Sequence, residues 1–363
     1  MQRFTSRSWF LLEAFALLVF ACATARAQAP APAASTTPTA ASAASAANTA
    51  PAFPQGIWEL SHENDWFIYS DRDYTGGLRL AYTTPNYRDW SQVPLVPLGY
   101  GSFFNKISLI NDDWATVAAA AYAQINIYTP DDQTLNPPNP YDRPYAGWVG
   151  LGTDLIRQTA DRRAIFEVNL GMVGPDSGAQ QLQDSFHSTI GDTQPAGWDY
   201  QIKDEPVLQL TYRQDWRMLG LTNLDAARSE PLGYDVIGHG LLTVGNGWDY
   251  AATGIQARIG YHLPLNFGPS RMRFGDVSSM PYVPGGTMSS DVSQWSLNAL
   301  SAYLTFGAEG RAIARDITLD GNSFSHSASV NKEPLVGEIY GGLTMEYGHF
   351  RGSFLVLYET NTF

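Results

Sequence analysis

Polar and apolar residues alternate along much of this chain, so that every second side chain is apolar. Residues 166–172 read FEVNLGM, residues 208–213 read LQLTYR and residues 255–261 read IQARIGY. Successive side chains of a β-strand point to opposite faces, so this period of two predicts strands with one apolar and one polar face. The chain is therefore expected to be all-β.

The same pattern predicts twelve strands, an even number, as closure of an up-and-down bacterial barrel requires. The expected strands lie at 57–67, 74–84, 118–128, 145–157, 162–174, 204–217, 232–246, 253–264, 296–307, 309–318, 334–347 and 350–362. The predicted fold is a transmembrane antiparallel β-barrel. Alternation alone also fits a soluble sandwich, which buries one face in the same rhythm.

One segment departs from the period of two. Residues 179–190 show a helical pattern, with Asp176 or Ser177 as the expected N-cap, and Gly191 and Pro195 are expected to end the helix. A helix inserted after the fifth strand of a barrel indicates a role in plugging, gating or catalysis.

The first residues are typical of an export signal. Arg3 and Arg7 precede an apolar run at 9–21, and residues 25–27 form a small-x-small cleavage site. Attachment of lipid at Cys22 is a less favoured alternative, because the residues before this cysteine are a poor attachment signal.

Three segments are expected from this reading. A signal peptide occupies 1–27, a disordered linker of Ala, Pro, Ser and Thr occupies 28–54, and an outer-membrane β-barrel occupies 55–363. The single cysteine lies in the signal peptide, so the mature chain forms no internal disulfide. No later window is apolar over 18 residues, so the mature chain can cross a membrane only as a barrel.

The charge of the chain limits the classes of molecule that it is expected to bind. Its formal net charge is -13, and no basic stripe is present to neutralise phosphates, so nucleic-acid binding is not expected. The acidic surplus fits a protein that uses divalent cations near anionic lipids, although solubility explains it equally well.

Three features favour the membrane barrel over an exported soluble β-protein. The chain carries an export signal, aromatic residues often flank the expected strands, and the last residue is Phe363. Aromatic girdles and a terminal aromatic residue are typical of outer-membrane barrels. The bacterial outer membrane is therefore the expected location.

The expected helix carries the first candidate for chemistry. Gln183 and His187 are four positions apart and share one face, with Asp184 beside them. Histidine titrates near neutral pH and is the usual group that takes a proton from water. The simpler alternative is a surface histidine on a loop helix.

The second candidate is rich in oxygen atoms. Asn64 and Asp65 end the first expected strand, and Asp73 and Thr75 begin the second. Carboxylate and amide oxygens are the ligands that calcium prefers. An ordinary hairpin turn uses the same residue types for its backbone geometry, so both interpretations stay open.

The third candidate is Arg143, which opens the fourth expected strand and can hold a lipid phosphate or pair with Asp142. The chain has no Gly-x-Ser-x-Gly motif, and its only cysteine lies in the leader. If the protein is a hydrolase, activated water is therefore the expected nucleophile.

Six motifs, taken together and in order, resemble the lipid A 3'-O-deacylase (LpxR) family. They are Glu63-Asn64-Asp65; Asp71-Arg72-x-Tyr74-Thr75-x-Gly77; Ile127-Tyr128-Thr129-Pro130; Asp142-Arg143-Pro144-Tyr145-Ala146-Gly147-Trp148; Gly174-Pro175-x-Ser177-Gly178 with Gln183-x-x-x-His187; and Gly197-Trp198-Asp199-x-Gln201 with Glu205. The resemblance covers nearly all of 57–363 and is most specific between 174 and 205.

The resemblance implies a calcium-dependent outer-membrane enzyme that hydrolyses the 3'-acyloxyacyl ester of lipid A. It implies that His187 takes a proton from water. Asn64, Asp65 and Thr75 would line the site where Ca²⁺ and the ester carbonyl meet, with Gln183 beside them. Calcium would polarise that carbonyl as a Lewis acid.

The expected metal ligands, substrate-binding residues and partners are as follows. Asn64, Asp65 and Asp73 are the expected metal ligands, and Arg143 and Glu205 the expected substrate-binding residues. The expected partners are lipid A, as part of lipopolysaccharide, and the membrane, and the expected form is a monomer.

Two positions differ from the family pattern. A lysine expected soon after the Tyr-x-Pro element is missing from 131–141, and Thr193 stands where an acidic residue is expected, next to Asp192. Another acylated lipid is therefore an alternative substrate.

A further alternative is a non-enzymatic barrel that has a structural role or forms a narrow channel. In that case Arg213, Arg258 and Glu346 would face inward and line the lumen.

Overall fold

The computed structural model describes residues 56–64, 73–96, 100–104, 115–191, 193–221, 231–278, 281–282, 300–347 and 350–363. The predicted signal peptide and linker lie outside these residues, and so does Asp65. For Asn64 and Asp73 the backbone is described and the side chain is not.

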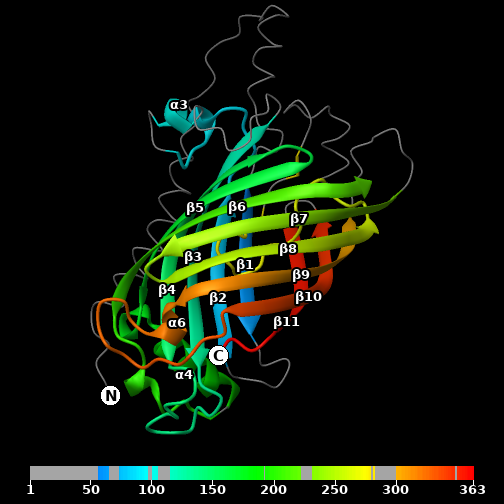
Figure 1. Cartoon of the computed structure of the whole chain (residues 1–363). Helices are drawn as coiled ribbons and strands as arrows, with labels where there is room; N and C mark the ends of the chain where they lie inside the picture. The colour runs from blue at the N-terminus through cyan, green and yellow to red at the C-terminus, as the bar shows by residue number, and fades with distance from the viewer. Residues whose placement is uncertain are drawn as a thin grey trace, which may run out of the picture.

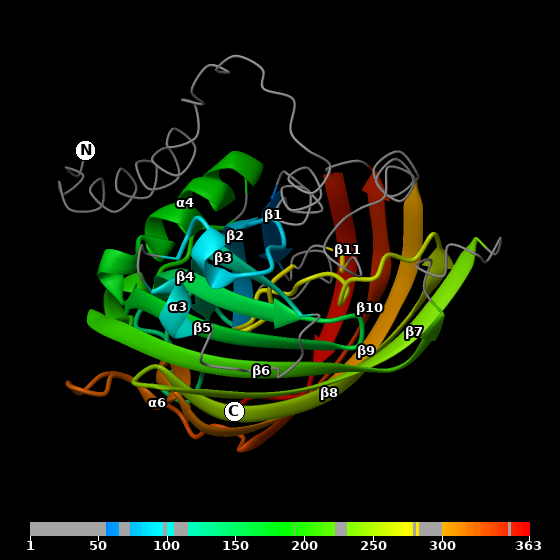
Figure 2. The same cartoon turned by 90° about the horizontal axis from the view of Figure 1, so that it is seen from above.

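The described strands form one antiparallel sheet in which each strand pairs with its neighbours in sequence (Figure 1). They are β1 (Ile57–Asn64), β2 (Asp73–Thr83), β3 (Thr116–Thr129), β4 (Ala146–Gln158), β5 (Arg162–Val173), β6 (Glu205–Leu221), β7 (Leu232–Gly245), β8 (Trp248–Tyr261), β9 (Ser301–Asp316), β10 (Leu335–Tyr347) and β11 (Phe350–Glu359). Seen from above, the sheet curves into an almost closed barrel (Figure 2). The predicted all-β barrel is confirmed.

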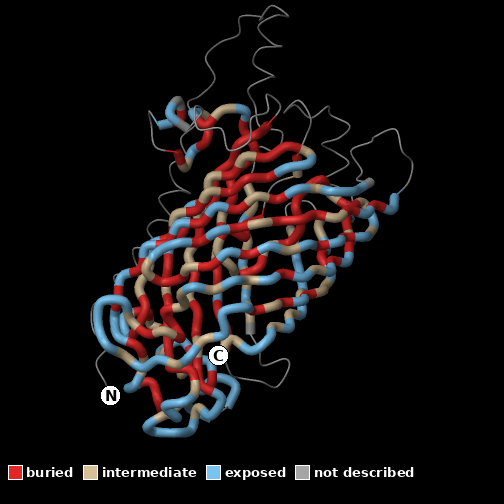
Figure 3. Tube along the Cα trace, in the orientation of Figure 1, coloured by how far each residue is buried: buried red, intermediate tan, exposed pale blue. Residues whose placement is uncertain are grey.

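The two faces of the sheet differ in a way that is typical of a barrel in lipid. Buried and exposed residues alternate along the strands (Figure 3). On β5, Glu167 and Asn169 are buried in the interior, whereas Leu170 is 59% exposed on the outside. A soluble β-protein buries its apolar face, so polar residues inside and large apolar residues outside favour the membrane barrel over the soluble alternative.

The described residues contain eleven strands rather than the expected twelve. The segments 296–307 and 309–318, predicted as two strands, form the single strand β9 instead. Across the expected turn, Gly307 and Glu309 pair with β8 on one side and with β10 on the other. Because both neighbouring strands continue through this level, the backbone satisfies its hydrogen bonds by staying extended.

The C-terminal residue also differs from expectation. Strand β11 ends at Glu359, so Phe363 does not close the final strand. Its ring lies 5.9 Å from the guanidinium carbon of Arg143.

An inner loop, residues 263–278, follows β8 in sequence and lies in the lumen, where its yellow trace runs inside the sheet in Figure 2. Arg79 of β2 donates to the carbonyl of Asp276 at 2.7 Å, and Glu167 of β5 accepts from the amide of Gly275 at 2.7 Å. Arg271 pairs with Glu309 of β9 at 2.7 Å. The loop is therefore bound to strands on opposite parts of the wall.

The residues predicted to line an open channel contact charged groups instead. Arg213 pairs with Asp215 at 2.9 Å, Arg258 with Asp235 at 2.5 Å and Glu346 with Arg351 at 2.8 Å. Together with the inner loop, these ion pairs occupy the lumen that a channel would need.

The described helical segments are short. They are η2 (Trp90–Gln92), α3 (Gly101–Phe104), η3 (Pro175–Ser177), α4 (Ala179–Ile190), η4 (Trp198–Tyr200) and α6 (Ile317–Asp320). In the part of the chain that the structure describes, none of them is long and apolar enough to span a membrane.

Helix α4 has the predicted bounds and ends at Gly191 as predicted. Its N-cap is Gly178, at φ 76°, so the expectation that Asp176 or Ser177 occupies the N-cap position is wrong, although Ser177 Oγ accepts from the amide of Ala179 at 3.4 Å. Both residues belong to η3, because the chain makes one tight turn before α4 begins. Only glycine adopts this left-handed conformation readily, which explains the glycine at each end of the helix.

Candidate active site

Helix α4 packs on the outer surface of the barrel wall. On β3, Tyr128 faces the lumen, where it packs against the same buried cluster as Phe274 of the inner loop. Side chains alternate along a strand, so Ile127 faces outward. Ile127 lies in one buried cluster with Ala179 of α4 and Trp198 of η4. The helix therefore covers the outside of β3.

Gly147 of β4 allows this close approach. It pairs with Ile127 in the sheet and so shares the outward face. A Cβ atom at Gly147 would overlap Ser177 Oγ and Ala179 Cβ. The missing side chain leaves the space into which the start of α4 fits.

Every fourth residue of α4 points toward the wall. Ala179, Gln183 and His187 have exposed fractions of only 1%, 2% and 4%. Because this spacing places residues on one helix face, two polar side chains are buried between the helix and the barrel. His187 is thus not the exposed loop histidine of the simpler alternative.

The amide group of Gln183 is held at both ends. Trp198 Nε1 donates to Gln183 Oε1 at 2.9 Å, and Gln183 Nε2 donates to Gln133 Oε1 at 3.0 Å. Gln133 itself is placed by its carbonyl, which accepts from the hydroxyl of Tyr145 at 3.1 Å. Gln133 was not predicted, because no periodic pattern or motif surrounds it in the segment between β3 and β4.

The backbone carbonyl of Thr193 orients the imidazole of His187, with Nδ1 and the oxygen 2.6 Å apart. A carbonyl oxygen only accepts, so Nδ1 carries the proton and donates. In the neutral ring Nε2 is then the nitrogen without a proton, which is the form that accepts one. The chain thus uses a carbonyl at the position where the family pattern predicts an acidic side chain.

Asp184 adjoins this row on α4 and is partly exposed. Partial burial raises its pKa above the ordinary value for an aspartate, and the nearby His187 opposes that rise. Asp184 is therefore the acidic group of α4 that the imidazole influences.

Thr75 lies on the same outer wall, at the start of β2. A β-bulge between Tyr74 and Gly76 sets it out of the regular ladder, and its Oγ1 lies 2.5 Å from Thr129 Oγ1 at the end of β3. Thr129 follows Ile127 by two residues and so shares its outward face. Bulges often redirect a side chain beside an active site.

The sheet register relates the two halves of the predicted site. Asn64 pairs with Gly76, Gly76 with Ile127, and Ile127 with Gly147, which lies beneath α4. Adjacent strands are about 4.8 Å apart, so the backbone of Asn64 is about 14 Å along this row from Gly147. The backbone of Asn64 and helix α4 therefore lie at the same end of the barrel, although many residues separate them in sequence.

The two predicted substrate-binding residues lie elsewhere. The guanidinium group of Arg143 donates to Thr318 Oγ1 at 3.1 Å and lies over the ring of Tyr128, which faces the lumen. Glu205 accepts hydrogen bonds from the amides of Ser323 and Phe324 at 2.8 and 3.2 Å. These contacts hold together the end of the barrel, and neither residue joins the buried row of α4.

Among the described residues of the site, the oxygen atoms that could bind calcium all belong to uncharged side chains. Thr75, Thr129 and Gln133 carry hydroxyl and amide oxygens, which are hard donors. Among the residues the structure describes, no group of three histidine, cysteine or acidic side chains is placed to hold a metal ion. The carboxylates that calcium needs would come from Asp65 and Asp73, whose side chains lie outside the described residues.

Comparison with known proteins identifies similar chains. The family model described as "Outer membrane protein LpxR" matches residues 17–363. The solved structure of LpxR from Salmonella typhimurium is similar, with a TM-score of 0.61 and 19% identity over 84% of this chain and 93% of that chain. At this identity the likeness shows a shared fold. No curated protein matches.

Proposed function

Because the chain belongs to the LpxR family of outer membrane proteins, we propose that it hydrolyses the 3'-acyloxyacyl ester of lipid A. The observation that carries this proposal is the imidazole of His187, which α4 buries against the outer wall and a carbonyl orients. The protein would act in the outer membrane on lipid A, the anchor of lipopolysaccharide, as a monomer.

In the proposed reaction, Nε2 of His187 takes a proton from water while the water oxygen attacks the ester carbonyl carbon. Collapse of the tetrahedral intermediate breaks the bond to the sugar oxygen, and the imidazolium returns the proton to that oxygen. The products are the acyloxyacyl carboxylic acid and a free 3'-hydroxyl. In this cycle the imidazole accepts one proton and later releases it, so His187 acts first as a general base and then as a general acid.

The other residues would hold this arrangement in place. Gln183, held by Trp198 and Gln133, would keep the buried face of α4 in position beside the attacking water. Thr75 presents its hydroxyl on the same wall. When bound by Asn64, Asp65 and Asp73, calcium would supply positive charge for the developing oxyanion.

The position of the site supports a membrane substrate. The buried row of α4 lies on the outward face of β3 and β4, the face that carries exposed apolar side chains elsewhere on the barrel. An ester at the boundary of the outer leaflet can reach this face without entering the lumen.

The test is His187→Ala, compared with Ser188→Ala on the exposed side of the same helix. Loss of a general base lowers rates by about 10²–10⁴-fold. Mass spectrometry of lipid A from cells expressing each variant should show the 3'-deacylated species with wild type and Ser188→Ala, and not with His187→Ala.

Heat-modifiable migration on a gel checks that all three proteins fold. Unmodified lipid A in cells that contain folded wild-type protein would contradict the proposed substrate. Equal activity of His187→Ala and wild type would contradict the proposed base.

A further inference from the structure

Helix α4 carries a second row of residues that the proposed reaction does not use. Leu182, Phe186 and Ile190 follow one another at intervals of four residues, with exposed fractions of 37%, 40% and 44%. This spacing places them along one side of the helix, next to the buried row. We refer to these three residues as the apolar flank.

The remaining exposed residues of α4 are polar. Gln181, Ser185, Ser188 and Thr189 are all exposed, and of these Gln181 and Ser188 lie on the side away from the apolar flank. A helix on a soluble protein buries its apolar row and exposes its polar one. On α4 the arrangement is the opposite, because the polar side chains of Gln183 and His187 are buried and the apolar flank is exposed.

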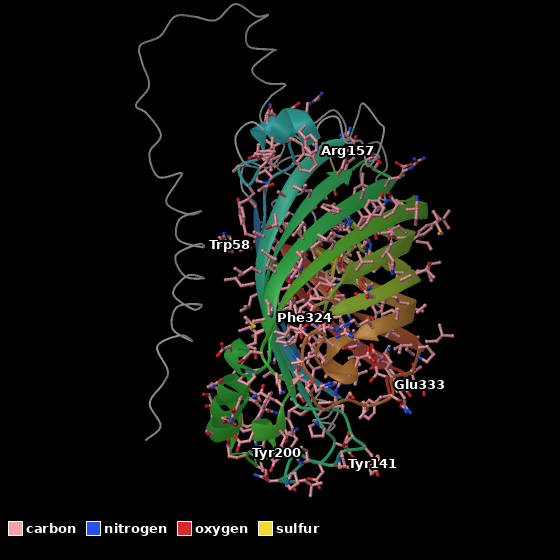
Figure 4. All side chains as sticks on the ribbon, turned by 60° about the vertical axis from the view of Figure 1, so that its left-hand side comes forward. Trp58, Tyr141, Arg157, Tyr200, Phe324 and Glu333 are labelled. Atoms are coloured by element: carbon pink, nitrogen blue, oxygen red, sulfur yellow. The ribbon has the colours of Figure 1, made fainter. Side chains whose placement is uncertain are left out.

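The apolar flank continues a surface of the barrel that is itself apolar. Helix α4 lies outside the wall (Figure 2). On the strands, Leu78, Leu151 and Leu170 are exposed by 40%, 44% and 59%. Tyr200, also half exposed, lies beside the helix at the same end of the barrel (Figure 4). Amphipathic aromatic rings are typical of the level where lipid head groups begin.

We propose that the apolar flank inserts among the acyl chains of the outer leaflet, so that α4 lies along the membrane boundary. Helices of this kind bury an apolar face about 5–10 Å into the boundary between head groups and acyl chains. Membrane lipid would therefore cover the apolar flank, as it covers the exposed apolar side chains of the neighbouring strands.

Insertion would fix the depth of the candidate site. The apolar flank and the row that contains His187 belong to one rigid helix, so the position of the first sets the position of the second. The imidazole would then lie at the level of an ester that joins a sugar head group to its acyl chains. This consequence rests on the proposed function, whereas the insertion itself rests on the barrel lying in a membrane.

Site-directed spin labelling tests the insertion. The chain has one cysteine, Cys22, so a full-length Cys22→Ser background accepts a single label. Labels at Phe186→Cys and Leu182→Cys are compared with a label at Gln181→Cys, in protein folded into phosphatidylcholine vesicles. The flank labels should collide more often with oxygen, which dissolves in acyl chains, than with a water-soluble nickel chelate. The Gln181 label should show the opposite preference.

A preference of both flank labels for the nickel chelate would overturn the proposal. So would flank labels that neither reagent reaches, because protein rather than lipid would then cover the helix. Leu182→Cys keeps the test decisive if Phe186→Cys does not fold.

Activity provides a second, separate readout. Phe186→Ser should lower hydrolysis of lipid A in vesicles by about tenfold, since it removes the apolar surface of one aromatic ring from lipid. Hydrolysis of the same lipid dispersed in detergent should change much less, and an equal loss in both would count against insertion. If wild type hydrolyses no lipid A while the flank labels report lipid, the proposed function fails and the insertion stands.

Discussion

At the scale of single residues, the candidate site depends on side chains whose orientation other residues determine. His187 has its proton on Nδ1 because a carbonyl oxygen lies 2.6 Å away. Gln183 has its amide oriented by an indole on one side and a second glutamine on the other. Neither orientation follows from the residue types alone, because all three partners, Thr193, Trp198 and Gln133, lie in segments without a periodic pattern.

Trp198→Phe tests the orientation of Gln183. The substitution keeps the aromatic ring and removes the donor to Gln183 Oε1, a hydrogen bond worth about 1 kcal/mol. We expect about a fivefold fall in deacylation of lipid A, measured by mass spectrometry, with folding unchanged. Tyr200→Phe in the same short helix, where the side chain is half exposed, is the matched control and should retain activity.

The calcium expectation is tested at Asp65 and Asp73. Each carboxylate would contribute charge to the metal site, so Asp65→Asn and Asp73→Asn should raise the calcium concentration needed for half-maximal deacylation by about tenfold or more. A chelator should abolish wild-type activity, and added calcium should restore it. Activity that persists in chelator would show that the site works without the metal.

At the scale of elements, the decisive contact is between α4 and the barrel wall. The helix approaches closely because Gly147 lacks a side chain. The hydrophobic pattern predicted the helix and its bounds, since its period differs from that of the strands. The pattern did not predict that the helix would lie on the outside of β3 and β4.

Gly147→Ala tests this contact. The added methyl group would overlap Ser177 and Ala179 and should displace the helix, lowering deacylation by at least tenfold and exposing the helix to protease. Gly310→Ala is the control, because an added Cβ there meets no atom within 4 Å. Equal effects of the two substitutions would show that α4 does not pack closely against Gly147.

At the scale of the whole molecule, the inner loop and its ion pairs lie inside the barrel and join it to the wall. Asp276 lies 3.0 Å from Arg271 and 3.5 Å from Arg213. Burial raises the pKa of Asp276, but the two arginines outweigh it, so the pKa lies below its usual range. The inner loop is therefore bound most tightly when this carboxyl is ionised.

This lowered pKa predicts a dependence of stability on pH. A group whose pKa is depressed by folding stabilises the protein above its unfolded pKa of about 3.9, and that contribution is lost as the pH falls through the folded value. The urea midpoint should therefore fall between pH 7 and pH 3 by more in wild type than in Asp276→Asn. An equal fall in both proteins would show that Asp276 does not couple to folding.

Much of this architecture follows from local chemistry. The period of two in a sequence such as residues 166–172 predicts a strand whatever surrounds it, because alternating side chains point to opposite faces. The helical pattern of residues 179–190 predicted a helix in the same way. The separation of residues 296–318 into two strands was wrong, because pairing with β8 and β10 keeps the backbone extended through 307–309.

The sequence by itself determined an all-β barrel interrupted by one helix; the chemistry of imidazole made His187 a candidate base, and the family resemblance added Gln183 and Thr75. Only the tertiary structure decided that β2, β3 and β4 bring Thr75 and the buried face of α4 to one outer wall, and that Arg143 contacts Thr318 while Glu205 contacts the amides of Ser323 and Phe324. It also placed Gln133 beside Gln183 and the inner loop in the lumen. The physical reason is that the period of a segment determines only which way each side chain faces. Which residues distant in sequence come into contact depends on the register and curvature of the sheet, and these are determined by all the strands together.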